Sequence, residues 1–306
     1  MPDPTTDTKS RVALLVHSCD RYEFLFKGFE YFFNDHWDFN IDCNHYFATE
    51  EKEVSIKGFK NIRSGKGEWA DRLRYLLDNE IPEDYILYFQ EDMWLNKKVN
   101  ANFFNQLFES AVNNKWKHVK LHSSSVYTTE QGNQFIDGFN IATVDNPNSD
   151  FLMSHQVTLW EKQYLIDQLH KGEHPWRNER KGTKRLRKLN PEIFHIDYFA
   201  ENGNQEINKN NNPLFRSAYN TISLNGVLTP DVEYYIQKLE AGNSEQKEYA
   251  SKLRYNYQNH LTHDGKEKPR KVDFFKRMKN MLTNKKWTAV VKLLFVKRPP
   301  ETAGKW

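Results

Sequence analysis

A short strand that runs directly into two adjacent carboxylates is the feature of this sequence that most restricts its fold. Residues 86–89 form an apolar, aromatic and β-branched run, typical of a strand covered on both faces in an α/β protein. Glu91 and Asp92 follow after a single residue, Gln90. Ligands of open α/β sheets bind beyond the carboxyl ends of the strands, where hard carboxylate oxygens suit Mg²⁺ or Mn²⁺ carrying a substrate phosphate. The alternative is a solvated acidic turn after a strand.

The residues upstream predict a first strand-helix unit. Residues 12–16 are apolar throughout and indicate a fully buried strand. A small polar turn, residues 17–21, leads into a helix over residues 22–33, in which aromatic side chains recur at helical spacing. Asp20 is placed to cap the amino end of that helix.

A second unit adds an arginine to the pattern. Residues 40–47 alternate weakly as a strand, and glycines within residues 64–67 supply a turn. The helix that follows places Arg72 beside a buried stripe with spacing i, i+4, i+7 and i+8, formed by Trp69, Leu73, Leu76 and Leu77. The order is therefore strand, helix, strand, glycine turn, helix with an arginine, strand and carboxylates.

Short motifs over roughly residues 11–230 resemble a group of bacterial polysaccharide and lipopolysaccharide glycosyltransferases of the GT-A type. The motifs are SCDRY at 18–22, WADRL at 69–73, LYFQED at 87–92, Trp160 and PWRNE at 175–179. The resemblance implies an α/β fold, GT-A-like and Rossmann-type, with a mostly parallel sheet flanked by helices. It also implies a nucleotide-sugar donor.

The resemblance assigns roles to individual residues. The polar turn after the first strand lines the nucleotide in that family, the arginine lies near the diphosphate, and a DxD-like triplet carries the metal. The nucleotide and donor contacts implied here are Ser18, Asp20, Arg21, Arg72, Gln90 and Glu91. Glu91 and Asp92 are the implied ligands of Mn²⁺ or Mg²⁺. Gln90 stands where the family has a carboxylate, so metal independence is also compatible with the sequence.

Residues 151–160 have the character of a strand, and His155 and Gln156 within it are candidates to line the donor-sugar pocket. The simpler expectation for His155 is a buried histidine held by hydrogen bonds. The histidines of the chain show no zinc-ligand spacing, which argues against a zinc enzyme.

Glu179 is the candidate catalytic base. It lies in a helical turn begun by Pro175, beside Trp176, whose ring offers an apolar face to an acceptor sugar. Inverting sugar transfer needs a carboxylate that takes the proton of the attacking hydroxyl, whereas a retaining mechanism would not need this base. Asp150 and Glu161 are alternative candidates. The structural alternative for Glu179 is an ion pair with Arg177, Arg180 or Lys184.

Composition agrees with a single soluble enzyme. The 306 residues are 38% hydrophobic with a net charge of +3, too little positive charge to indicate nucleic-acid binding. Cys19 and Cys43 are the two cysteines, which favours reduced cytosolic thiols over a disulfide framework. The polar N-terminus is not a signal peptide, and no apolar run approaches a membrane span.

Three segments are predicted along the chain. Residues 1–10 are expected to be disordered, residues 11–240 to form the GT-A-like domain, and residues 241–306 to form a helical, basic extension. Near its end, apolar residues at helical spacing alternate with Lys and Arg. That pattern predicts a peripheral, membrane-surface helix, with a helix docked on the enzyme core or on a second copy as the alternative.

The sequence thus predicts a cytoplasmic glycosyltransferase, and its basic extension adds the expectation of peripheral binding to the inner face of the cytoplasmic membrane. It would transfer a sugar from a nucleotide-diphosphate sugar to a glycan or lipid-linked acceptor during bacterial surface polysaccharide synthesis, assisted by metal and with inversion. Two alternatives remain open at this point. One is a nucleotidyltransferase acting on a sugar phosphate, and the other is a carbohydrate-binding or membrane-tethering protein without catalysis.

Overall fold

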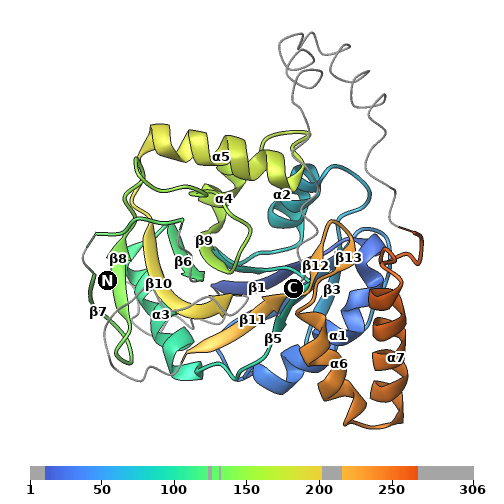
Figure 1. Ribbon diagram of the computed structural model, residues 1–306. Coiled ribbons are helices and arrows are strands. Elements are labelled where there is room, and N and C mark those ends of the chain that lie inside the picture. The colour runs from blue at the N-terminus through green and yellow to red at the C-terminus, as the bar shows by residue number, and fades with distance from the viewer. Residues whose placement is uncertain (1–10, 123–125, 131, 202–215, 268–306) are drawn as a thin grey trace, which may run out of the picture. The chain divides into compact units, whose positions relative to one another are not determined.

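A computed structural model describes residues 11–122, 126–130, 132–201 and 216–267 (Figure 1). The expectations for the N-terminal segment 1–10, and for the membrane-surface helix within 268–306, lie outside the described residues. Within the described part, no helix is both long and apolar enough to cross a membrane.

In the part of the chain that the structure describes, a mixed sheet of eleven strands forms the centre of the fold. The strand order is β3-β2-β1-β4-β9-β6-β10-β11-β5, with β8 paired to β10 and to β7. Because β9 runs antiparallel to both β4 and β6, all of β1, β2, β3, β4, β6, β10 and β11 run in one direction. The strands are β1 Val12–His17, β2 Asn44–Thr49, β3 Lys60–Arg63, β4 Tyr85–Phe89, β5 Met93–Leu95, β6 His118–His122, β7 Asn133–Gln134, β8 Asn140–Thr143, β9 Thr158–Glu161, β10 Phe194–Glu201 and β11 Ser217–Thr221. A separate hairpin joins β12 Ser223–Leu224 to β13 Val227–Leu228.

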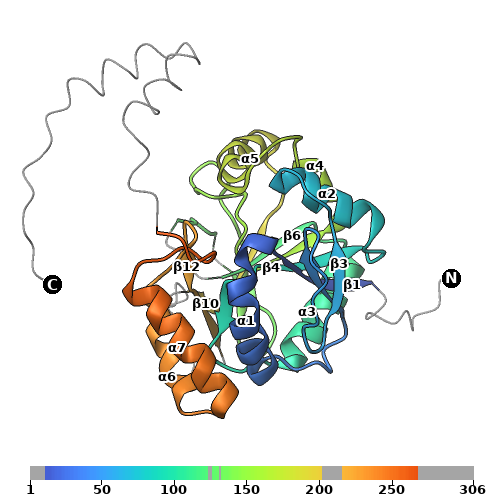
Figure 2. The same cartoon turned by 90° about the vertical axis from the view of Figure 1, so that its right-hand side faces the viewer.

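Helices cover both faces of this sheet (Figures 1 and 2). α2, α4 and α5 pack into the core on one face, and α1, α3, α6 and α7 pack into the core on the other. The helices are α1 Glu23–His36, α2 Trp69–Asn79, α3 Ala101–Asn114, α4 Lys162–Gln168, α5 Pro175–Leu189, α6 Val232–Glu240, α7 Ser244–Gln258 and the short 3-10 helix η2 Asp20–Tyr22. The predicted fold class, a Rossmann-type sheet flanked by helices, is confirmed.

Burial on both faces explains why the central strands are apolar at every position. Leu14 and Leu87 face the core beneath α1 and α3, whereas their neighbours Leu15 and Ile86 face the core beneath α2. Successive side chains of a strand point to opposite faces. A strand with a helix layer on each side therefore needs apolar residues throughout, as the sequence predicted for β1 and β4.

Several elements differ from expectation. The strand expected over residues 151–160 is limited to β9, and the helical turn expected at Pro175 continues as the 15-residue helix α5. α3, β5 and β10 were not predicted. α7 lies beyond residue 240 and packs beside α6 and α1, where the backbone N–H of Gly28 donates to Tyr249 Oη at 3.2 Å.

The aromatic residue after the acidic pair anchors it. Trp94 on β5 is fully buried, and its indole Nε1 donates to the carbonyl of Glu91 at 3.1 Å. The ring lies against Gly28 of α1, where a Cβ atom would come within 2.0 Å of it. β5 also pairs with β11, and the N–H of Ile222 donates to the carbonyl of Asp92 at 3.0 Å. The turn that carries the two carboxylates is therefore fixed from both sides.

Candidate functional site

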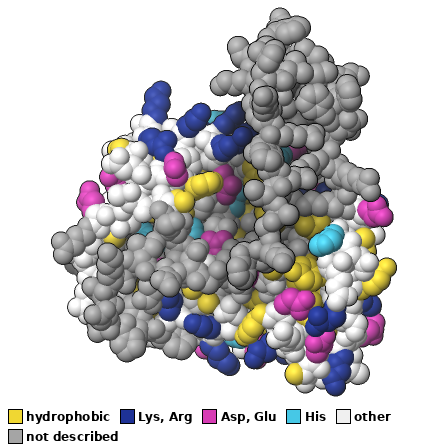
Figure 3. Space-filling view, viewed as in Figure 1, with side chains coloured by type: hydrophobic (Ala, Val, Ile, Leu, Met, Phe, Trp, Pro, Cys, Tyr) yellow, Lys and Arg dark blue, Asp and Glu magenta, His cyan; other side chains and the backbone are white. Residues whose placement is uncertain are grey.

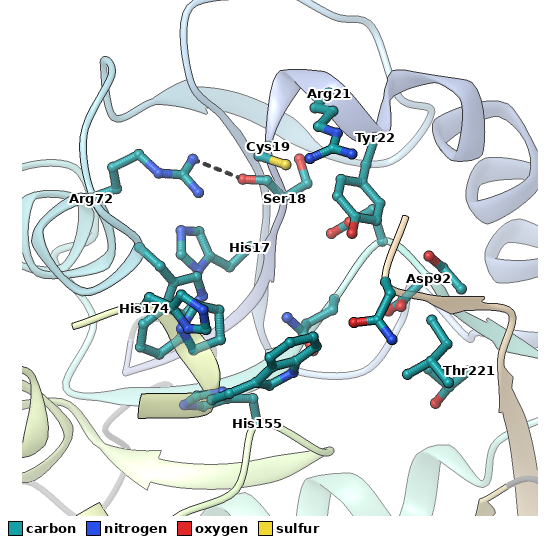
Figure 4. Close-up of a pocket in the computed structure, with 18 of the residues that line it drawn as sticks. His17, Ser18, Cys19, Arg21, Tyr22, Arg72, Asp92, His155, His174 and Thr221 are labelled. Carbon is teal, nitrogen blue, oxygen red and sulfur yellow. Dashed lines mark hydrogen bonds between the residues drawn. The ribbon is translucent and has the colours of Figure 1, made fainter. Parts of the chain in front are cut away.

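A pocket of about 560 Å³ lies at the carboxyl ends of β1 and β4. It also takes in α2, the first turn of α5 and the β12–β13 hairpin (Figure 4). The lining residues are His17, Ser18, Cys19, Arg21, Tyr22, Glu50, Trp69, Arg72, Gln90, Glu91, Asp92, His155, Gln156, His174, Pro175, Trp176, Glu179, Thr221, Ser223, Leu224 and Asn225. Of the residues that the sequence singled out for donor, acceptor, metal or base, three do not line it: Asp20, Asp150 and Glu161.

Asp20 supports the pocket wall from outside and does not cap α1. Its carboxylate accepts hydrogen bonds from the backbone N–H groups of Glu50 (2.9 Å), Glu51 (3.0 Å) and Lys52 (3.1 Å). Its own N–H donates to Glu50 Oε2 at 3.0 Å. Asp20 therefore fastens the turn after β1 to the loop after β2, which contributes Glu50 to the pocket.

Arg72 brings a buried positive charge to the pocket. Its side chain is 7% exposed, and Nη1 donates to the carbonyl of Ser18 at 3.1 Å (dashed line in Figure 4). Nη1 also lies 3.6 Å from Glu50 Oε1. The Nε–H is buried and finds no hydrogen-bond partner within the described chain. Because a guanidinium stays charged at any physiological pH, Arg72 can meet an anionic group of a ligand.

His17 closes the floor of the pocket as a neutral ring. It is buried at the end of β1, with Nδ1 3.3 Å from Tyr88 Oη and its ring centroid 5.7 Å from that of Trp69. Burial lowers the pKa of His17 well below its ordinary value, and the charges of Arg72 and His155 lower it further. The histidine therefore adds no competing positive charge beside Arg72.

Glu91 and Asp92 form an electrostatically strained pair in the pocket, and Figure 4 shows Asp92 across it from Arg72. Glu91 is 6% exposed, so it does not belong to a solvated acidic turn. Burial raises the pKa of Glu91 well above its ordinary value, and the Asp92 charge raises it further. Burial also raises the pKa of Asp92 to about 7. Two adjacent carboxylates, one buried and one half-buried, that both resist ionisation favour a cation beside them.

The donor set fits a divalent cation that shares its coordination with a ligand. Asp92 Oδ1 is buried and accepts no hydrogen bond from the described residues. No group of three His, Cys, Asp or Glu side chains in the described ranges is arranged to hold a metal ion. Mg²⁺ usually binds through one or two carboxylates, with substrate phosphates and water completing its shell. Glu91 and Asp92 match that pattern.

Glu179 is held in place by the segment before β9. The backbone N–H of His155 donates to Glu179 Oε1 at 3.1 Å, and Nε2 of the same histidine lies 3.1 Å from Asn178 Oδ1. Burial lowers the pKa of His155, whose ring centroid lies 4.2 Å from that of Trp69. The Glu179 side chain is 19% exposed, and none of the described Lys or Arg residues forms an ion pair with it.

Trp176 and Gln156 complete the side of the pocket near Glu179. Trp176 is 52% exposed although it lines the pocket, so its ring is available to a ligand. Gln156 Oε1 accepts a hydrogen bond from Tyr219 Oη at 2.7 Å, which orients the amide. Exposed aromatic faces of this kind suit the apolar face of a sugar ring.

The two alternative base candidates lie in other environments. Asp150 has a side chain that is 78% exposed and pairs with Arg187 Nη2 at 3.3 Å. Glu161 caps α4, since its two carboxylate oxygens accept the backbone N–H groups of Gln163 (3.3 Å) and Tyr164 (2.6 Å). Neither residue lines the pocket.

Two charged residues near the pocket were missed by sequence reasoning. Glu201 ends β10, and burial raises its pKa to about 7, with the Asp92 and Glu179 charges adding to the effect. Lys120 on β6 is fully buried, and burial lowers its pKa to about 7. Its Nζ lies 3.3 Å from Tyr127 Oη. The sequence signal for Glu201 was weaker than that for Glu91, because the strand that ends at Glu201 is interrupted by His195 and Asp197.

Scans against protein-family models and against curated proteins return no match for this chain. Among solved structures, S. aureus TarS 1-349 in complex with UDP-GlcNAc is similar, with a TM-score of 0.42 and 10% identity over 87% of this chain and 77% of that one. A UDP-glucose pyrophosphorylase complexed with UDP-glucose has a TM-score of 0.36 and 10% identity, covering 61% of this chain and 90% of that one. Matches at this level do not assign a function, which must come from the residues of the pocket.

Proposed function

We propose that this chain is a nucleotide-sugar-dependent glycosyltransferase, which moves a sugar from a nucleotide diphosphate to a glycan or lipid-linked acceptor of a bacterial surface polysaccharide. The observation that carries the proposal is the meeting of Arg72, the Glu91–Asp92 pair and Glu179 in one pocket. Its volume of about 560 Å³ lies within the range of about 300–1,000 Å³ common for small-molecule sites. Each group serves a different part of the reaction.

Arg72 would stabilise the leaving group. As the bond between the sugar C1 and the phosphate oxygen breaks, negative charge accumulates on the nucleoside diphosphate. A fixed cation placed where that charge develops lowers the barrier, most strongly in a site that excludes water. The buried guanidinium, held by the carbonyl of Ser18, is such a cation. Because His17 is neutral, Arg72 has no second positive charge beside it.

Glu91 and Asp92 would hold Mn²⁺ or Mg²⁺ together with oxygens of the diphosphate. When bound, the ion supplies Lewis-acid charge to the departing phosphate. Through that ion, the two carboxylates would hold one side of the diphosphate, while Arg72 would meet its other side. The sugar would then extend toward Glu179, which lines the same pocket.

Glu179 would act as the base of an inverting reaction. Its Oε1 is fixed by the His155 N–H, and Oε2 accepts no hydrogen bond from the described residues. The carboxylate takes the proton of the acceptor hydroxyl while that oxygen forms a bond to C1. The bond from C1 to the phosphate oxygen breaks at the same time, so the anomeric configuration inverts. Trp176 would support the acceptor ring beside the base.

A nucleotidyltransferase would use the same sheet and acidic pair but attack at phosphorus. Such enzymes usually place a glycine- and lysine-rich loop after the first strand, and residues 17–22 contain neither residue type. That reaction would also leave Glu179 and Trp176 without a role. The pocket therefore favours transfer at the sugar carbon.

Calorimetric titration with nucleoside diphosphates in the presence of Mn²⁺ tests the donor half of the proposal. Arg72→Ala should weaken binding by about 1.5–3 kcal/mol, the usual worth of a hydrogen bond to a charged group. Arg63→Ala is the matched control, because Arg63 is exposed and does not line the pocket. If folded Arg72→Ala bound the nucleotide as tightly as the control, Arg72 would have a structural role.

A further inference from the structure

The exposed face of α5 carries a row of positive charges that begins at the pocket. Of the 15 residues in this helix, seven are Lys or Arg and one, Glu179, is acidic. Figure 3 shows Lys and Arg side chains gathered over α5 at the top of the molecule. We call the exposed members the α5 stripe: Arg177, Arg180, Lys181, Lys184 and Lys188.

The spacing of the α5 stripe puts its members on one side of the helix. Counted from Arg177, they fall at i, i+3, i+4, i+7 and i+11, the repeat of a single helical face. At 1.5 Å per residue the row extends about 16 Å along the helix axis. It starts beside Trp176 and Glu179, which both line the pocket, and runs away from the pocket.

The stripe lacks the acidic partners that neighbouring cations have. On other sides of α5, Arg185 pairs with Glu173 at 3.0 Å and Arg187 pairs with Asp150 at 3.3 Å. In the stripe, Lys181 approaches Glu173 at 3.8 Å, whereas the described residues offer no carboxylate to the other four members. Like charges at i, i+3 and i+4 destabilise a helix. Lys188, in the last turn of α5, is favoured by the helix dipole, but the first four members of the stripe gain nothing from it. Folding of the helix therefore does not explain the row as a whole.

We propose that the α5 stripe binds a linear anionic glycan whose terminal sugar is the acceptor in the pocket. This inference rests on the proposed function and adds the class of acceptor. The terminal sugar would lie on Trp176 near Glu179, and acidic groups of the preceding units would follow the stripe. Guanidinium and ammonium groups bind both phosphate and carboxylate, so the shared chemistry is a repeated anion. A single row of positive charges that leads out of a pocket matches the shape of a linear polymer.

Neutralising three stripe residues tests this inference. The stripe variant is Arg180→Gln, Lys184→Gln and Lys188→Gln together, and the control variant is Lys57→Gln, Lys98→Gln and Lys247→Gln. The control residues are exposed and do not line the pocket. Both variants are made in the full chain, so the basic residues after 266 are common to all proteins and cancel in the comparison.

Binding to soluble polymers is measured with inorganic polyphosphate, polygalacturonate and neutral dextran. At low salt the stripe variant should bind one or both polyanions about 10- to 100-fold more weakly than the control variant, as expected for three exposed ion pairs. The slope of log Kd against log salt should fall by about two. Its melting temperature should equal or exceed that of wild type, because repulsion within the helix is relieved.

Other outcomes overturn the inference. Equal polyanion binding by the stripe and control variants would leave the stripe as a solvated helix face. Stripe-dependent binding to phosphatidylglycerol vesicles, without stripe-dependent binding to soluble polyanions, would make it a membrane surface. Nucleoside diphosphate binding is measured on the same proteins and should be unchanged in the stripe variant. If the wild-type protein did not bind a nucleoside diphosphate, the proposed function would be contradicted. The result with the polyanions would still be interpretable by itself.

Discussion

Replacing Glu179 by Gln should lower the rate of sugar transfer by about 10²–10⁴-fold, the usual contribution of a positioned general base. Donor binding should be retained. Gln keeps the shape of the side chain and can still accept the His155 N–H, but it cannot take a proton at neutral pH. Turnover is followed by release of the nucleoside diphosphate, and donor affinity by calorimetry. Donor hydrolysis should fall as well, because water needs the same base.

Two matched variants sharpen this prediction. Asp150→Asn removes a carboxylate that is exposed and paired with Arg187 outside the pocket, so it should leave turnover unchanged. Glu201→Gln removes the missed carboxyl near Asp92 and Glu179. If turnover survives in Glu179→Gln and collapses in Glu201→Gln, the base has been assigned to the wrong residue. A product with retained anomeric configuration would mean that neither Glu179 nor Glu201 is needed as a base.

Replacing Asp92 by Asn should abolish transfer, with a loss of about 10³-fold or more, since the charge of a bound metal supplies several kcal/mol. EDTA should have the same effect on wild type. Glu91→Gln should cost less if Asp92 is the principal ligand, and equal losses would indicate shared coordination. Full activity of Asp92→Asn, or activity in EDTA, would contradict the metal assignment.

Loss of activity in Asp92→Asn should not come with loss of stability. The pKa of Asp92 is raised from 3.8 to about 7 in the folded chain, so its ionised form is disfavoured by folding. Above pH 7 the carboxylate is charged in the folded state and this cost is fully present, and below about pH 4 it is neutral in both states. In EDTA, Asn should therefore raise the melting temperature at pH 8, and the gain should disappear toward pH 4.

The central strands were predictable because their environment leaves little choice. A strand between two helix layers must be apolar at every position, so β1 and β4 could be predicted from their continuous apolar runs. The acidic pair could be located for the same reason, since a parallel strand delivers its following residues to one edge of the sheet. The same rule applied to β10 would have located Glu201. However, β10 contains His195 and Asp197, and such a run of mixed residues is harder to recognise as a buried strand.

Side-chain roles that depend on distant loops could not be predicted. The sequence places Asp20 at a helix start, yet its carboxylate binds the backbone of a loop 30 residues away. Glu161 and Glu179 look alike in sequence, as acids beside helices. The structure makes the first an N-cap and puts the second in the pocket, because α5 starts at the pocket and α4 does not. Such differences follow from tertiary packing, which local patterns do not record.

A donor screen with analysis of the released products tests the central claim most directly. The full chain is incubated with Mn²⁺, a panel of nucleotide-diphosphate sugars and oligosaccharide acceptors, and the nucleotide product and glycan mass are measured together. The account predicts release of a nucleoside diphosphate that depends on the acceptor, equal in amount to the sugar added, and lost in Glu179→Gln. Conversion of the donor and pyrophosphate into a nucleoside triphosphate and a sugar 1-phosphate would contradict it, as would the absence of nucleotide binding.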